Sequence, residues 1–150
     1  MSTDLEARAT VKRNSQMAFE FTVSDVIPAS PEQIYAAWLS GKSHAAMTGG
    51  GPATGSTKVG GRFTAWDGYI AGKNLRLEPQ RRIVQSWRTT EFKQIDADSE
   101  IDVQLEAVGK RTKITLRHSN VPEGHSGYKT GWQTCYFDPM KAYFEGAAKK

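Results

Sequence analysis

The segment EIDVQLEAVGKRTKITLRH, residues 100–118, decides the fold class. Apolar side chains alternate with polar ones through Ile101 and Val103, and the same alternation returns at Ile114 and Leu116. A period of two places successive side chains on opposite faces of a β-strand. Because the intervening residues are all polar, the segment predicts two antiparallel strands in a sheet with one buried face and one solvated face.

Alternation on the amino-terminal side of this segment predicts the rest of the sheet. The further strands are expected at residues 19–27, 60–66, 69–77 and 83–88. Asp67-Gly68 is a dipeptide favoured in two-residue type I′ turns, so the strands on either side of it should form a tight hairpin.

The strand after this hairpin contains a break in its alternation, because Ile70 is out of phase by one residue with Leu75 and Leu77. A β-bulge near Gly72 to Asn74 would let all three apolar side chains face the core while bending the strand. We therefore expect a curved sheet.

Two short helices are expected after the first strand. Ser30 is placed to cap the first of them, with Pro31 at the first helical position and Gln33 at the position that completes a capping box. Ile34, Ala37 and Trp38 supply its buried stripe.

The last element is a long helix that begins near Gly127 and should bury one aromatic face against the sheet. Pro139 interrupts this helix, so we expect a kink near Cys135, four residues earlier. The residues of the stripe are Tyr128, Trp132, Cys135, Tyr136, Pro139, Tyr143 and Phe144.

This order of elements predicts an α+β fold, with a curved antiparallel sheet of about six or seven strands wrapped on a long C-terminal helix. Residues 1–16 are polar and should form an arm, and residues 17–150 should form one domain. A curved sheet and a helix cannot touch everywhere, and the gaps between them are natural sites for small ligands.

Composition bounds the possible functions. The chain has 150 residues, and its 20 basic and 16 acidic side chains are interspersed, giving a net charge of +4. This pattern lacks the basic stripe typical of nucleic-acid binders, so no nucleic-acid partner is expected. Cys135 is the single cysteine, which excludes an intramolecular disulfide. With no signal peptide or membrane-spanning run in the sequence, we expect a cytoplasmic protein without membrane insertion.

Several motifs, in this order along the chain, resemble the C-terminal domain of the activator of heat-shock protein ninety ATPase. They are Gly60-Gly61-Arg62-Phe63, Gly68-Tyr69-Ile70-Ala71-Gly72, Leu77-Glu78-Pro79, Ile83-Val84-Gln85-Ser86-Trp87-Arg88, Leu116-Arg117-His118-Ser119-Asn120-Val121-Pro122, Gly131-Trp132 and Tyr136. The resemblance covers about residues 18–146. It implies a helix-grip fold within the superfamily of START-like and polyketide-cyclase-like proteins, and a role in the stress response. The eukaryotic activator has a further N-terminal domain, for which 150 residues leave no space.

The expected ligand-binding residues are large aromatic side chains with one polar edge, together with one histidine. His118 shares a strand face with Ile114 and Leu116, so it either points into a pocket as a polar anchor or is a hydrogen-bonded core histidine. Asp25 should lie several residues away from His118, so the two are not expected to form a dyad. The candidate set is Trp66, Tyr69, Trp87, His118, Trp132 and Tyr136.

No catalytic residue, metal site or cofactor is expected. The histidines and Cys135 lack metal-ligand spacing, and Cys135 should be an inert thiol buried on the helix stripe. The glycine-rich loop at Gly49 to Gly55 matches neither a phosphate-binding loop nor a dinucleotide fingerprint, and it is interpreted either as an exposed connector or as a lid.

Three functions remain open. The first is a binding module for a small hydrophobic or aromatic ligand. The second, implied by the resemblance, is a protein-interaction module that modulates a heat-shock chaperone ATPase. The third is an enzyme of the cyclase, dehydratase or hydrolase kind, although no acid–base constellation supports it. The chain is expected to be a monomer or a homodimer.

Overall fold

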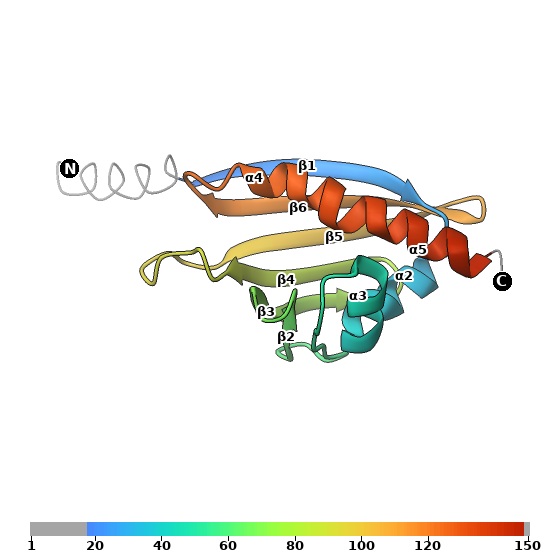
Figure 1. The fold of residues 1–150 in the computed structure, drawn as a ribbon, viewed down its shortest axis with the longest axis horizontal. Helices are drawn as coiled ribbons and strands as arrows, with labels where there is room; N and C mark the ends of the chain where they lie inside the picture. The colour runs from blue at the N-terminus through green and yellow to red at the C-terminus, as the bar shows by residue number, and fades with distance from the viewer. Residues whose placement is uncertain (1–17, 149–150) are drawn as a thin grey trace.

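The structure, a computed structural model that describes residues 18–148, consists of one sheet with helices packed on it (Figure 1). The predicted arm at residues 1–16 lies outside the described residues. In chain order the elements are β1 (Ala18–Ile27), α2 (Pro31–Leu39), α3 (Gly41–Thr48), β2 (Arg62–Ala65), β3 (Ile70–Glu78), β4 (Arg82–Thr89), β5 (Ser99–Val108), β6 (Arg111–Pro122), α4 (Gly127–Gly131), η1 (Trp132–Phe137) and α5 (Asp138–Ala148).

The sheet has six strands in the order β1-β6-β5-β4-β3-β2, and every neighbouring pair is antiparallel. The helical run α4–η1–α5 lies along the sheet. Helices α2 and α3 lie near the α5 end of this run, and α3 contacts α5 (Figure 1). The predicted α+β helix-grip fold, with two short helices after the first strand, is confirmed. The first and last strands in chain order, β1 and β6, pair with each other, so Asp25 faces Ile114 across their ladder.

The alternation of apolar and polar residues in the segment 100–118 is confirmed in strands β5 and β6. Ile101, Val103, Ile114 and Leu116 are all buried at the interface between the sheet and the helices. Their polar neighbours along β5 and β6 lie on the opposite face. The sheet therefore has one dry face, and the long helix covers it.

The turn between β2 and β3 is centred on Asp67-Gly68, as predicted. Both residues have positive φ, 55° and 86°, which is the geometry of a type I′ turn. The amide of Tyr69 donates to the carbonyl of Trp66 across it. Trp66 itself also has a φ of 55°, which the sequence did not indicate.

The predicted bulge in β3 exists, but it lies one residue later than expected, between Asn74 and Arg76. Leu75 is the bulged residue and is 38% exposed, so the prediction that it faces the core was wrong. Asn74 is turned inward instead and is only 1% exposed. Its amide donates to the carbonyls of Ser56 and Lys58, and these bonds offset the cost of burying a polar side chain.

Helix α2 begins with the predicted capping box. The Ser30 hydroxyl accepts from the Gln33 amide at 3.1 Å, and the Gln33 side chain accepts from the Ser30 amide at 2.9 Å. The stripe of Ile34, Ala37 and Trp38 is buried, as the spacing indicated. This places the Trp38 indole over the sheet, at the inner end of the site described below.

The disturbance expected near Cys135 takes the form of a π-helical turn, η1, rather than a simple kink. The amide of Asp138 donates to the carbonyl of Gln133, five residues back. Pro139 follows immediately and has no amide hydrogen to give, which explains why the normal ladder is interrupted here. Trp132 and Tyr136 both lie in this turn and both face the sheet.

Candidate functional site

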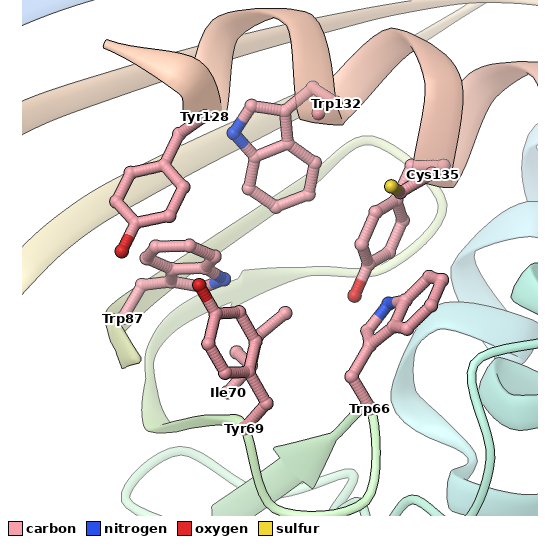
Figure 2. Close-up of a pocket in the computed structure, with 9 residues that line it drawn as sticks. Trp66, Tyr69, Ile70, Trp87, Tyr128, Trp132 and Cys135 are labelled. Carbon is pink, nitrogen blue, oxygen red and sulfur yellow. The ribbon is translucent and has the colours of Figure 1, made fainter. Parts of the chain in front are cut away.

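A cavity of about 210 Å³ lies between the long helix and the sheet (Figure 2). Its walls come from the β2–β3 turn, strand β4 and the helical run, which approach one another but do not close completely. The lining is almost wholly aromatic carbon, and no charged side chain is among the described residues that line it. Those residues are Trp66, Tyr69, Ile70, Trp87, Tyr128, Gly131, Trp132, Cys135 and Tyr136.

The structure brings together five of the six residues that the sequence singled out. Only His118 does not line the cavity. Ile70, Tyr128, Gly131 and Cys135 line it but were absent from the predicted set. Their signal was present in part, because Tyr128, Gly131 and Cys135 lie at three- and four-residue spacings along the same helix face as Trp132.

His118 lies behind the cavity wall, where both of its ring nitrogens are occupied. Its Nδ1 accepts from the Trp132 indole at 3.0 Å, so its proton is on Nε2, which donates to the Ser99 hydroxyl at 2.8 Å. Ser99 in turn donates to the carbonyl of Trp87. Burial lowers the pKa of His118 to about 3. The structure therefore gives His118 the core role, and the idea that it anchors a ligand directly is corrected.

A second buried histidine, His44, holds the inner corner of the cavity. Its Nδ1 faces the carbonyl of Trp38 at 2.9 Å and must donate to it. Its Nε2 is then free to accept, and it receives the Tyr136 hydroxyl at 2.7 Å. Burial lowers the pKa of His44 and raises that of Tyr136, so both stay neutral.

Sequence reasoning missed this histidine, although a weak signal existed. His44, Met47 and Thr48 form a buried stripe at helical spacing on α3. In so short a helix, three positions do not distinguish a buried face from chance, and the partner Tyr136 lies 92 residues away. Only the packing of α3 against the long helix brings the two together.

The outer end of the cavity carries a second group of polar contacts. The Tyr69 hydroxyl donates to Glu91, and the Tyr128 hydroxyl contacts Thr89 at 2.6 Å and His125 at 3.1 Å. Burial, helped by the contact with Glu91, raises the pKa of Tyr69, and burial also raises that of Tyr128. Both tyrosines therefore present neutral hydroxyl groups near the rim.

The glycine-rich loop supports Trp66. A Cβ placed on Gly50 would lie 2.4 Å from the Trp66 ring, so only glycine lets the indole pack at this position. The loop is tied down on both sides, because Thr54 and Thr64 exchange backbone bonds and the Asp67 amide donates to Pro52. These contacts describe a fixed connector that positions a cavity residue.

One further expectation needs correction. Cys135 is exposed rather than buried, because its part of the helix stripe faces the open cavity instead of packed side chains. Asp25, the polar break in the apolar face of β1, has three donors around its carboxylate. It accepts from the Val26 amide, from Gln133 and from Lys141. Although burial opposes ionisation, these three donors together lower the pKa of Asp25.

The described residues 18–148 offer no cluster of three or more His, Cys, Asp or Glu side chains that would hold a metal ion. Within the same range, none of the helices has the length and apolar character needed to cross a membrane. The aromatic cavity is where five of the sequence-predicted side chains converge.

Comparison with curated proteins identifies relatives of one kind. The chain is 27% identical over 133 residues to the Activator of 90 kDa heat shock protein ATPase homolog 1 of Homo sapiens, covering 87% of this chain and 38% of that protein. It is 26% identical over 98 residues to the corresponding homolog of Dictyostelium discoideum, covering 64% of this chain and 25% of that one. The chain therefore spans well under half the length of these relatives.

Solved structures show the same fold. An HSP90 activator from Plasmodium falciparum superimposes with a TM-score of 0.75 at 23% identity, covering 85% of this chain and 96% of that chain. CalU16 from Micromonospora echinospora gives a TM-score of 0.69 at 22% identity, covering 88% of this chain and 80% of that chain.

The sequence profile of the family described as Activator of Hsp90 ATPase homolog 1-like protein matches residues 28–145. The matching segment includes every residue that lines the cavity. This agrees with the motifs that the sequence presents between residues 60 and 136. Because the match covers most of the chain, this protein belongs to the Activator of Hsp90 ATPase homolog 1-like protein family.

Proposed function

We propose that this chain binds a small hydrophobic or aromatic molecule in the cavity between the long helix and the sheet. The observation that carries the proposal is a preformed, aromatic-lined space of about 210 Å³ beside the hydrophobic core. Protein interiors normally leave few voids larger than a water molecule, and an apolar cavity of roughly 150 Å³ already accepts a benzene-sized ligand.

Neutral polar groups at both ends of the cavity support binding rather than catalysis. His118 has no free nitrogen, and Tyr69, Tyr128 and Tyr136 keep their protons at neutral pH. A general acid or base needs a pKa near the working pH and access to the substrate, and these groups do not combine the two. The three tyrosine hydroxyl groups can orient a ligand through hydrogen bonds.

The test uses Gly131, which lines the cavity and has open space where a side chain would project. Replacing it with leucine, Gly131→Leu, should fill the ligand volume while also favouring the helix by about 0.5–1 kcal/mol relative to glycine. We expect native mass spectrometry of the protein purified from its own host to show a bound small molecule in the wild type and none in Gly131→Leu.

The matched control is Gly127→Leu, because Gly127 lies in the same helical run, also has open space around it and does not line the cavity. This variant should keep the bound mass. A bare polypeptide for the wild type, or an identical bound mass in Gly131→Leu, would contradict a ligand in this cavity.

The family and the curated relatives favour a second candidate function, the modulation of a heat-shock chaperone ATPase. If this chain acts in that way, adding it to a purified 90 kDa heat shock protein should raise ATP turnover several-fold, measured by phosphate release. A reaction without the chaperone corrects for ATP hydrolysis by contaminants. Unchanged turnover at saturating concentrations of this chain would argue against the role.

A further inference from the structure

A carboxylate lies at the outer end of the cavity. Glu91 does not line the cavity itself, but its side chain accepts a hydrogen bond from the hydroxyl of Tyr69, which does. Figure 2 shows the hydroxyl groups of Tyr69 and Tyr128 on the same side of the enclosed space, next to Trp87. The negative charge of Glu91 is therefore separated from the cavity by a single side chain.

The backbone fixes Glu91 in this position. Directly after β4, the amide of Thr90 donates to the carbonyl of Tyr69 at 3.0 Å, and the amide of Glu91 donates to the Thr89 hydroxyl at 3.2 Å. The Thr89 hydroxyl also contacts that of Tyr128 at 2.6 Å. The segment that carries Glu91 is thus tied both to the β2–β3 turn and to helix α4, which form the two sides of the rim.

The charge of Glu91 is not neutralised by a basic side chain. None of the ion pairs formed within residues 18–148 includes it, and the residue is exposed. Its influence reaches the lining residues, because burial and the hydrogen bond to Glu91 raise the pKa of Tyr69, and burial and the charge of Glu91 raise that of Tyr128. A carboxylate accepts several hydrogen bonds, so Tyr69 leaves room for a second donor.

The hydrogens of the other polar groups are directed into the protein. The hydroxyl of Tyr136 donates to His44, and the indole of Trp132 donates to His118. The Trp66 indole nitrogen faces the Tyr136 oxygen, and this contact opposes the rise in the pKa of Tyr136 that burial causes. The faces of the lining rings are electron-rich, and such faces attract a cation that lies within about 6 Å. The surroundings of the cavity therefore favour a ligand that donates hydrogen bonds.

From this arrangement we infer that the ligand is an aromatic amine, with its ring in the cavity and its protonated amino group at the rim beside Glu91. The inference rests on the proposed function and specifies its ligand class. An ammonium group at the rim would donate to Glu91 and meet the faces of the lining rings, and it would keep part of its hydration because Glu91 is exposed. An anion would lose hydration beside a charge of its own sign.

Three probes share one ring system and differ in charge. Indane is apolar, 2-aminoindane is cationic at neutral pH, and indane-2-carboxylate is anionic. Titrations of ¹⁵N-labelled protein would follow the indole N–H signals of the four tryptophans, of which Trp66, Trp87 and Trp132 line the cavity. We expect 2-aminoindane to bind about tenfold more tightly than indane, as for one partly exposed charge-assisted hydrogen bond. Indane-2-carboxylate should bind more weakly than indane.

The Glu91→Gln variant removes the charge and keeps an acceptor for the Tyr69 hydroxyl. It should bind indane within about twofold of wild type and lose most of the preference for 2-aminoindane, since the charge-assisted bond is gone. The matched control is Glu106→Gln, which removes an exposed charge from the opposite face of the sheet and should keep the preference. Added salt should reduce the preference in wild type and have little effect in Glu91→Gln.

The Gly131→Leu variant tests whether the probes occupy the cavity. Because the leucine side chain would fill the same space, this variant should lose the binding of indane and of 2-aminoindane alike. Amine binding that survives in Gly131→Leu would place the amine on the outer surface and overturn the inference.

The outcomes separate this inference from the proposed function. Equal binding of indane and 2-aminoindane, or tighter binding of the carboxylate, would overturn the inferred ligand class and leave the binding function intact. An unchanged amine preference in Glu91→Gln would overturn the role given to Glu91. If no probe shifts a cavity tryptophan signal at millimolar concentration, the binding function itself is wrong.

Discussion

Replacing Trp132 with alanine is expected to lower the free energy of unfolding by about 3–5 kcal/mol. The side chain is 2% exposed and packs against Trp38, Trp87 and Tyr136. Its indole also satisfies the Nδ1 of His118, so the substitution leaves both a void and an unpaired buried nitrogen. Urea denaturation followed by circular dichroism measures the loss.

Two variants test the reason for this loss. Trp132→Phe keeps an aromatic ring but loses the indole N–H and part of the indole, so it should cost at least the roughly 1–3 kcal/mol penalty of leaving the buried His118 nitrogen unsatisfied. Trp66→Ala should cost less than Trp132→Ala, because Trp66 is only half-buried. A loss below about 1 kcal/mol for Trp132→Ala would mean that this side chain lines an open site instead of supporting the core.

Acidification is expected to destabilise the protein well above the range in which most carboxylates protonate. His118 has a folded pKa of about 3 against an ordinary value of 6.5. The unfolded chain therefore takes up a proton that the folded chain excludes, and stability falls as the pH falls through this window. One such proton is worth about 1.4 kcal/mol per pH unit, so between pH 6.5 and 4.5 the loss should reach about 2–3 kcal/mol.

His44 acts in the same direction, because burial lowers its pKa as well. Urea denaturation from pH 7 to 4.5 measures how the free energy of unfolding changes with pH. A His118→Gln variant keeps a donor and an acceptor at this position, and its pH dependence should be smaller by the contribution of about one proton. A wild-type protein with constant stability across this window would show that His118 is charged in the folded state.

The sequence predicted the strands, the helix cap and the turn well, because each of them depends on residues that are close together in the chain. The period of two in β5 and β6, the capping box at Ser30 and the Asp67-Gly68 turn each depend on residues close together in the chain. The predicted aromatic residues of the cavity follow from the same logic, since a helix stripe must face the sheet. Trp132 and Tyr136 meet at the cavity for that reason, and Trp66, Tyr69 and Trp87 join them from the β2–β3 turn and strand β4.

The errors arise where a polar side chain finds a distant partner. Asn74 replaces Leu75 in the core because carbonyls of the preceding loop and the Gln85 side chain bond to it. Gln85 also accepts from the Trp38 indole, which extends the buried network to the first helix. Patterning assigns polar residues to the surface, so a network of this kind is invisible until the fold is assembled.

The position of His118 also depends on a contact that the sequence pattern does not predict. Its alternation correctly indicates an inward-facing side chain, but it does not indicate what lies above it. Trp132 covers the histidine and takes the place next to the cavity. Likewise, the exposure of Cys135 depends on where the helix leaves the sheet uncovered. The spacing of residues along a helix does not predict that position.

The pairing of β1 with β6 determines the order in which this chain can fold. Almost the whole domain separates the two strands in sequence, so closing their ladder carries a large loop entropy and slows folding. During synthesis, β1 leaves the ribosome long before its partner exists. The long helix is made later still, and its arrival closes the cavity, so β1 and the apolar face of the sheet stay uncovered until that helix has been synthesised.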